Sequence, residues 1–272
     1  MIGGKKMNET LVTIIGISII FFCTSIGSSI VFFFKGKEIS TRVNQMFLGF
    51  ASGVMLSASV FSLIIPALED TTNNYMPIWI VVAISVFLGA LFIWGIDKLV
   101  PHLHSEGKEE GIKTNKITKT SKMFLAVTIH NVPEGLSVGI AYGVALANWN
   151  SNSSAALIGA LMLAVGIGIQ NIPEGAVVSL MYKGETGSSF KSFMFGVLSG
   201  AVEPVAAVVG LFLAMQIQAI MPWALAFAAG CMLYVIAEEM IPDMKGDSIN
   251  HYGVWSFIFG FILMMVLDVA LG

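Results

Sequence analysis

Long apolar segments follow one another along almost the whole chain, separated by short polar connections. Each has about 20 residues or more, the length that an α-helix needs to cross the hydrocarbon core of a bilayer. To within a few residues they cover 11–34, 43–66, 77–97, 122–146, 155–181, 190–216, 222–242 and 252–271. This pattern predicts an all-α polytopic membrane protein with eight transmembrane helices.

Composition excludes the ordinary soluble classes of protein. Hydrophobic residues make up 56% of the 272 residues and charged residues only 11%, and the mean hydropathy is +0.84. The net charge of -3 comes from few charges in the connections, and nothing indicates nucleic-acid binding. We expect residues 1–272 to form one membrane domain, with the first apolar segment retained as a span.

Basic residues distinguish the two sides of the predicted membrane domain. An even number of spans places both termini on one side, and that side carries only Lys5 and Lys6. The connections on the other side carry the remaining basic residues, so the positive-inside rule predicts external N- and C-termini. The longest connection, about 99–121, is rich in Lys and is predicted to be a mobile cytoplasmic loop.

One polar motif occurs twice inside the apolar segments. His-Asn-Val-Pro-Glu-Gly occupies 130–135, and Gln-Asn-Ile-Pro-Glu-Gly occupies 170–175. On a helix, each copy places a His or Gln, an Asn and a Glu on one face. The offset between the copies is one helix plus its connection, so we expect the motifs to meet near the midplane. Flanking glycines at 135, 139 and 143 and at 159, 166 and 168 are expected to let these two segments pack closely.

The glutamates of the motif need a counter-charge. On insertion scales, a charged side chain at the centre of a membrane helix costs roughly 2.5 to 3.5 kcal/mol. No Lys or Arg lies in the interior of either segment, so a metal ion or protons from outside the chain are the natural partners. Pro133 and Pro173 each remove a backbone donor and predict kinked helices that form a central site. Glu203, next to Pro204, adds a third buried carboxylate.

The types of candidate ligand limit which metal ions can bind. An imidazole, carboxylates and amide oxygens suit zinc, iron or manganese. Magnesium or calcium would be expected to use oxygen only, so His130 favours the transition series. The sequence lacks a His-Glu-x-x-His motif, which argues against an intramembrane metalloprotease, and it lacks an ATP-binding P-loop. No organic cofactor is predicted.

Together these features resemble the Zrt/Irt-like protein (ZIP) family of divalent metal transporters. The resemblance rests on the two Pro-Glu-Gly motifs in the fourth and fifth spans, the eight spans, the external termini and the His-bearing connection with His102 and His104. It covers essentially the whole chain. The second copy, with Gln170, resembles the bacterial branch called GufA-like.

The resemblance implies a set of metal ligands. One metal would be held by His130, Glu134, Gln170 and Glu174. A second metal beside it would be held by Asn131, Glu134, Asn171, Glu174 and Glu203, with Glu134 and Glu174 bridging. Asn171 stands where some binuclear members have Asp, and one negative charge fewer weakens the second site. Met55 matches a thioether that lies near the site in some relatives.

Charges near the ends of spans are candidates for a cation path. Glu69 and Asp70, at one external end, and Asp268, at another, are predicted to attract cations at the entrance. For Glu69 and Asp70, a plain solvated helix end is an equal interpretation. Near the cytoplasmic end, Glu238 and Glu239 are predicted to receive the metal on exit. His102, His104 and Glu106 are candidates for transient binding in the loop.

The resulting prediction is a divalent cation transporter in the cell membrane that is not an enzyme. It carries Zn²⁺ into the cytoplasm by alternating access, with Fe²⁺, Mn²⁺ and Cd²⁺ as further candidate substrates. The family resemblance implies that the first, fourth, fifth and sixth spans move against the other four and that homodimers form.

Three other readings remain open at this stage. In the first, the chain is a proton-coupled secondary transporter of an organic solute, and the buried glutamates relay protons. Its transport would survive chelation of divalent metals. In the second, it is a membrane enzyme for metal-assisted hydrolysis, which no motif supports. A structural or receptor-like protein, the third, leaves three buried carboxylates unexplained.

Overall fold

Helices make up nearly all of the part of the chain that the computed structural model describes. The described residues are 8–34, 40–69, 76–100, 102–103, 109–111, 119–147, 149–216, 221–245 and 251–271. Two short strands, β1 (His102–Leu103) and β2 (Glu109–Glu110), pair antiparallel with His102 opposite Glu110. Most of the connection predicted at 99–121 lies outside the described residues, as do the candidates His104, Glu106 and Asp70.

The predicted spans are present at the predicted places. Within the described residues, seven helical segments are long and apolar enough to cross a membrane: Glu9–Phe32, Thr41–Glu69, Ile78–Leu99, Ala155–Thr186, Ser189–Met215, Met221–Lys245 and Tyr252–Ala270. Helix α5 (Lys119–Ala147) carries the first copy of the motif, whose polar residues lower its hydropathy. Its 29 residues are also long enough to cross a bilayer. The chain is therefore an all-α polytopic membrane protein.

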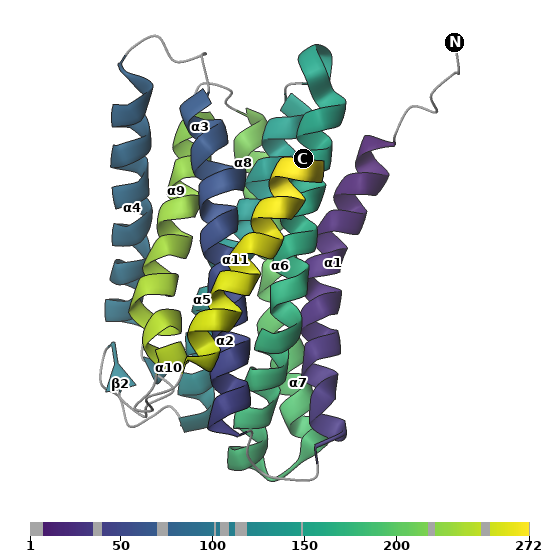
Figure 1. Cartoon of the computed structure of the whole chain (residues 1–272), viewed down its shortest axis with the longest axis vertical. Helices are drawn as coiled ribbons and strands as arrows, with labels where there is room; N and C mark the ends of the chain where they lie inside the picture. The colour runs from purple at the N-terminus through teal and green to yellow at the C-terminus, as the bar shows by residue number, and fades with distance from the viewer. Residues whose placement is uncertain are drawn as a thin grey trace.

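Both ends of the described chain lie at the same end of the bundle. Helix α1 (Glu9–Ser29) is extended by the short turn η1 (Ile30–Phe32). It begins at the same end of the bundle at which α11 (Tyr252–Leu271) finishes (Figure 1). We call this the terminal end. Lys98, at the last turn of α4 (Ile78–Leu99), and Lys183 and Lys191, around the connection between α6 (Trp149–Thr186) and α7 (Ser189–Gly200), mark the opposite, basic end.

Prolines shape two of the long segments in the same way. Helix α2 (Thr41–Ala58) widens into the π-helical turn η2 (Ser59–Ile64) just before Pro66 in α3 (Ile65–Glu69). Helix α9 (Met221–Val235) widens into η4 (Ile236–Met240) just before Pro242 in α10 (Ile241–Lys245). Proline lacks an N–H and its ring crowds the carbonyl four residues earlier, so a wider turn upstream relieves the crowding. Such π-turns frequently mark functional sites.

The prolines of the motif act differently. Helices α5 and α6 run through Pro133 and Pro173 without interruption. The helix breaks instead at Ala201, between α7 and α8 (Val202–Gln216), three residues before Pro204. This break leaves backbone carbonyls of α7 available for side chains from neighbouring helices.

Glycine contacts divide the helices into two groups. In the first group, a Cβ added at Gly27 of α1 would overlap the backbone of α6, and one at Gly139 of α5 would overlap the backbone of α8. In the second, a Cβ at Gly53 of α2 would overlap the backbone of α11, and one at Gly89 of α4 would overlap the backbone of α9. We call α1, α5, α6, α7 and α8 the ligand bundle. The frame bundle comprises α2, η2, α3, α4, α9, η4, α10 and α11.

The glycines beside the motif pack differently from the prediction. Gly135 and Gly139 face α8, whereas Gly168 and Gly175 face α1. Through these glycines, α5 packs closely against α8, and α6 packs closely against α1. Gly159 has no neighbour within 4 Å. The expectation that these glycines join α5 directly to α6 is therefore wrong.

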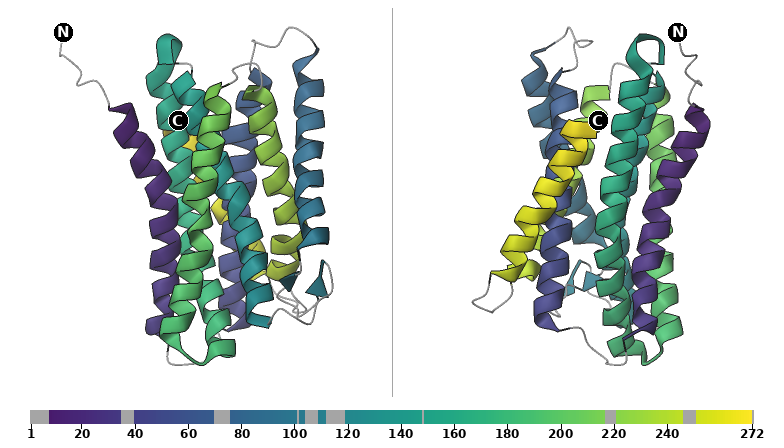
Figure 2. Two further views of the ribbon diagram at one scale, coloured as in Figure 1. Left: turned by 180° about the vertical axis from the view of Figure 1, so that it is seen from behind. Right: turned by 45° about the vertical axis from the view of Figure 1, so that its right-hand side comes forward.

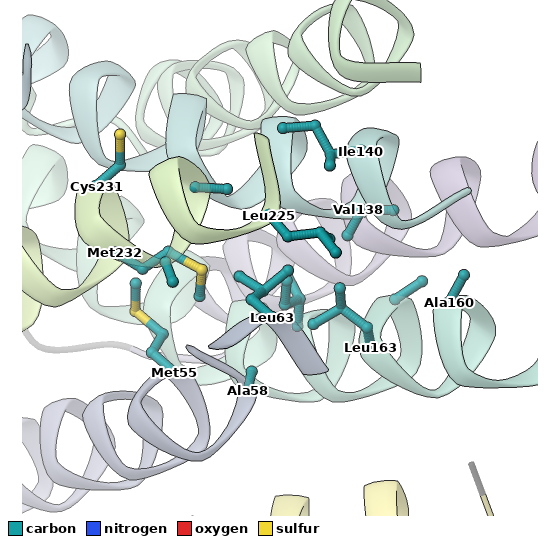
Figure 3. Close-up of a cluster of buried hydrophobic side chains, with 14 of the residues drawn as sticks. Met55, Ala58, Leu63, Val138, Ile140, Ala160, Leu163, Leu225, Cys231 and Met232 are labelled. Atoms are coloured by element: carbon teal, nitrogen blue, oxygen red, sulfur yellow. The ribbon is translucent and has the colours of Figure 1, made fainter. Parts of the chain in front are cut away.

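The two bundles stand side by side, with α4 and α1 at opposite edges of the molecule (Figures 1 and 2). Between them lies an apolar cluster to which both contribute (Figure 3). Leu63, Leu225 and Met232 come from the frame bundle, and Val138 and Leu163 come from the ligand bundle. The glycine described at this boundary, Gly166, faces the flexible side chain of Met264 rather than a backbone.

Candidate metal site

Every predicted ligand except Met55 belongs to the ligand bundle. His130, Asn131 and Glu134 lie on α5, and Gln170, Asn171 and Glu174 lie on α6. Glu203 lies in the first turn of α8. Asn131, Glu134, Gln170, Asn171 and Glu203 are each exposed by 2% or less, so they form a polar cluster inside the protein. Charged side chains this deep in a membrane helix mark a functional site by default.

The two copies of the motif meet at Glu134 and Gln170. The Gln170 Nε2 amide donates to Glu134 Oε1 over 2.6 Å. Four other buried oxygens of the two copies have no hydrogen-bond partner among the described residues: Asn131 Oδ1, Glu134 Oε2, Gln170 Oε1 and Glu174 Oε2. Leaving a buried acceptor unsatisfied costs roughly 1–3 kcal/mol each. Two carboxylate and two amide oxygens without partners are a donor set that fits a divalent cation.

His130 makes a contact across to the frame bundle. Its Nε2 lies 2.7 Å from Glu239 Oε2 of η4, so the imidazole joins the ligand bundle to the frame bundle. Electrostatic interactions nevertheless link His130 to Glu174 and to Asp97. In the described part of the chain, no three His, Cys, Asp or Glu side chains converge closely enough to hold a metal ion. The amides of Gln170, Asn131 and Asn171 lie between the charged groups in this arrangement.

Glu203 is surrounded by donors. Its Oε1 accepts from Thr24 Oγ1 over 2.8 Å and from Asn131 Nδ2 over 3.2 Å. Its Oε2 accepts from Asn171 Nδ2 over 2.9 Å. Asn131 Nδ2 also reaches the Ser199 carbonyl oxygen at 3.1 Å, next to the break between α7 and α8. Thus α8 is tied to α1, α5 and α6 through one carboxylate.

Met55 lies in the frame bundle, 1% exposed, within the apolar cluster. Figure 3 shows it beside Met232 and Ala58. Its sulfur is therefore part of the apolar boundary between the bundles in this arrangement.

The predicted entrance residues lie near the terminal end. Asp268 of α11 accepts from Ser62 Oγ of η2 at 2.7 and 2.8 Å. Both line a cavity of about 440 Å³ between the bundles, walled by Phe61, Leu163 and Leu225 among other apolar residues. Glu69, at the last position of α3, is exposed. The structure thus places Asp268 in a cavity and Glu69 at the surface.

The two predicted exit residues, Glu238 and Glu239, also differ from each other in exposure. Glu238 is exposed, whereas Glu239 pairs with His130 and its side chain is only 11% exposed.

Sequence reasoning missed Asp97, a buried carboxylate of α4 that acts electrostatically on His130. The signal for Asp97 is a charge at the end of an apolar segment, a position that is equally typical of an ordinary helix end. Thr24 and Ser62 gave no signal, because such residues usually bond their own helix backbone.

The sequence is similar to that of known transporters along most of its length. Residues 10–124 and 122–268 match the protein family described as ZIP Zinc transporter. Zinc transporter ZIP11 of Homo sapiens is 32% identical over 92% of this chain and 94% of its own length. Zinc transporter GufA of Myxococcus xanthus is 35% identical, over 87% of this chain and 90% of its own length. Zinc transporter ZIPB of Bordetella bronchiseptica is 30% identical, over 87% and 74% respectively.

Proposed function

The chain belongs to the ZIP family of zinc transporters, and from this premise we propose that it carries Zn²⁺ across the membrane through the polar cluster of α5 and α6. The observation that carries the proposal is the set of four buried oxygens without partners, one each on Asn131, Glu134, Gln170 and Glu174. Carboxylate and amide oxygens are ligands that a divalent cation takes, and its charge would balance two carboxylates. Among its described residues, the bundle carries no Lys or Arg at this depth.

Ligand chemistry supports zinc and leaves related ions as further substrates. Oxygen ligands from carboxylates and amides, joined by one imidazole, suit Zn²⁺, Fe²⁺, Mn²⁺ and Cd²⁺. A neutral His130 whose Nε2–H is held by Glu239 keeps Nδ1 available as a ligand, the arrangement in which an outer carboxylate orients a metal-binding histidine. Glu239 then acts on the metal through His130.

The division into two bundles supports alternating access. Within each bundle, glycines bring backbones into direct contact, so each bundle moves as a unit. Between the bundles the contact is made by side chains such as Met55, Leu163 and Leu225, which exchange neighbours more easily than backbones do. The ligand bundle carries the ion, and the frame bundle supplies the polar groups at either end.

Cations enter at the cavity that holds Ser62 and Asp268 and leave past Glu239 and Asp97. We assign the terminal end to the outside and the basic end to the cytoplasm, because basic residues gather at the latter. The protein is then a single transport domain of the cell membrane, with external termini and no catalytic activity, and it assembles as a homodimer.

The test is uptake of radioactive zinc into liposomes that contain the purified protein. We expect wild type to accumulate zinc and Glu134→Gln combined with Glu174→Gln to lose uptake, because the amides cannot balance the charge of the ion. Glu9→Gln combined with Glu185→Gln removes two carboxylates outside the cluster and is expected to transport as wild type does.

Equal zinc uptake by wild type and by the Glu134→Gln, Glu174→Gln variant would show that these two glutamates do not bind the transported ion. If wild type takes up no zinc, the same liposomes are tested with iron, manganese and cadmium. Transport of none of these ions would overturn the proposed function.

A further inference from the structure

Glu203 differs from Glu134 and Glu174 in how its charge is satisfied. A carboxylate offers about four lone-pair positions for hydrogen bonds. Three of them are filled on Glu203 by the donors of Thr24, Asn131 and Asn171, at 2.8, 3.2 and 2.9 Å. Glu134 and Glu174, by contrast, each keep a buried oxygen without a partner in the described part of the chain. Donors from the protein thus occupy the place that a metal would take on Glu203.

Asn131 shows what this arrangement achieves. Its Nδ2 donates to Glu203 Oε1 and to the Ser199 carbonyl, while its Oδ1 is one of the four oxygens without a partner. An amide held by its nitrogen has its oxygen fixed on the opposite side. Glu203 therefore sets the direction of the Asn131 oxygen, as outer carboxylates set the direction of metal ligands.

Asn171 is the residue that makes a second ion unnecessary. Its Nδ2 lies within 3.0 Å of both Glu203 Oε2 and Thr24 Oγ1. Because an amide donates where an aspartate would add charge, the pair Asn171 and Glu203 carries one negative charge instead of two. A single charge with three donors is stabilised without a cation.

Thr24 completes the cluster from α1. Its side chain is 4% exposed, donates to Glu203 and accepts from Asn171, so it links α8 to α6. Its hydroxyl also lies 3.1 Å from the Ile20 carbonyl, the usual bond of a helical threonine. The Thr24 hydroxyl is closer to Glu203 Oε1, at 2.8 Å, than to the Ile20 carbonyl. Thr24 therefore does more than bond the backbone of its own helix.

We propose that this protein binds one cation rather than two, and that Glu203 is a positioning residue, held by Thr24, Asn131 and Asn171, which aims the Asn131 oxygen at that cation. The inference rests on the proposed function, since it concerns the same metal site.

The test is the number of zinc ions bound per chain by the purified full-length protein in detergent, measured by equilibrium dialysis and elemental analysis. We expect one ion in wild type and one in Glu203→Gln, with the variant's Kd raised by about 10- to 100-fold. The introduced amide offers a donor that the Asn131 oxygen accepts, which turns that oxygen away from the ion.

Asn171→Asp supplies the opposite result. It places a second carboxylate beside Glu203, so we expect it to bind two ions per chain. Thr24→Val, which keeps the shape and removes the hydroxyl, is expected to weaken zinc binding, and Thr24→Ser is expected to restore it. Elution as a single species in size-exclusion chromatography serves as the folding control for each variant.

The outcomes separate the two claims. Two ions in wild type, one of which is lost in Glu203→Gln, would overturn the single-ion inference while supporting the proposed function. No bound ion in wild type would overturn the proposed function and the inference with it. Equal Kd values for wild type, Glu203→Gln and Thr24→Val would show that Glu203 does not position a ligand.

Discussion

The ligand bundle and the frame bundle are built from similar apolar helices, yet they handle polar residues in different ways. The ligand bundle concentrates its buried amides and carboxylates in one cluster, from Glu134 to Glu203. The frame bundle places its partly or fully buried carboxylates near the ends of the span: Asp268, with Ser62, near the terminal end, and Asp97 and Glu239 towards the basic end. Apolar side chains such as Leu63, Leu225 and Met232 represent the frame bundle in the apolar cluster that it shares with the ligand bundle (Figure 3).

Under the proposed function, this difference gives the two bundles different roles in transport: the ligand bundle would hold the ion and the frame bundle would form the barrier. A charged ion is costly in an apolar layer, so it remains with the bundle that holds its ligands. The frame bundle contributes an apolar barrier in the middle and polar contacts on either side of it. In the proposed mechanism, movement of the ligand bundle relative to that barrier would change the side from which the ion is reached.

Locking the bundles together is the change expected to have the largest effect. Gly166 of α6 and Met264 of α11 are in contact across the boundary. In a background with Cys23→Ser and Cys231→Ser, oxidation of Gly166→Cys with Met264→Cys should abolish zinc uptake, and reduction should restore it. The control is Ser28→Cys with Gly196→Cys, which are in contact inside the ligand bundle. Unchanged uptake by the oxidised cross-bundle pair would contradict relative movement of the bundles.

Glycine substitutions test whether each bundle is internally tight. Gly139→Ala in the ligand bundle and Gly53→Ala in the frame bundle place a methyl group against a backbone carbonyl of the neighbouring helix. We expect each to lower the free energy of unfolding by roughly 1–3 kcal/mol, the usual cost of overpacking. Gly159→Ala and Gly95→Ala, with open space around the new Cβ, are the matched controls in the two bundles. Thermal unfolding of the purified variants measures the difference.

The contact between His130 and Glu239 is a polar link between the bundles. Glu239→Gln removes the carboxylate from a largely buried imidazole, and we expect a loss of roughly 1–3 kcal/mol in the stability of this arrangement. Glu238→Gln, at the adjacent exposed position, should change stability little. Thermal unfolding of both variants gives the comparison, and equal midpoints would mean that the contact does not hold the bundles together.

The smallest effect is expected at the entrance. Asp268→Asn should raise the external zinc concentration needed for half-maximal uptake by less than about tenfold, because one carboxylate is only part of the field that attracts the ion. Glu69→Gln should have a smaller effect still, since water and salt screen an exposed charge. Initial rates of uptake over a series of zinc concentrations distinguish the two. A larger effect of Glu69→Gln than of Asp268→Asn would contradict an entrance at the cavity that Asp268 lines.

Much of the fold follows from hydropathy, and some of its details do not. The apolar segments gave the spans to within a few residues, because a bilayer requires about 20 apolar residues wherever a helix crosses it. Proline positions were less informative: Pro133 and Pro173 leave their helices unbroken, whereas the chain breaks at Ala201. At the break, Asn131 of α5 donates to the Ser199 carbonyl, a contact between helices that no local sequence pattern indicates.

The site was predicted in the same uneven way. The repeated motif identified the buried glutamates, because their cost in a membrane is a property of residue type and depth. The orientation of the ligands was not predictable: His130 contacts Glu239, and Glu203 contacts Thr24, a residue 179 positions away. Nothing local in the sequence encodes such a distant contact.

The sequence by itself therefore determined that this is an all-α membrane protein of the ZIP family with a repeated polar motif buried in two of its helices. Hydrophobicity and the cost of buried charge act on residue types, and they can be read without knowing any contact. Only the tertiary structure decided which oxygens keep no partner and which carboxylate is surrounded by donors. Those features depend on directions of side chains across helices that the chain brings together only when it is packed.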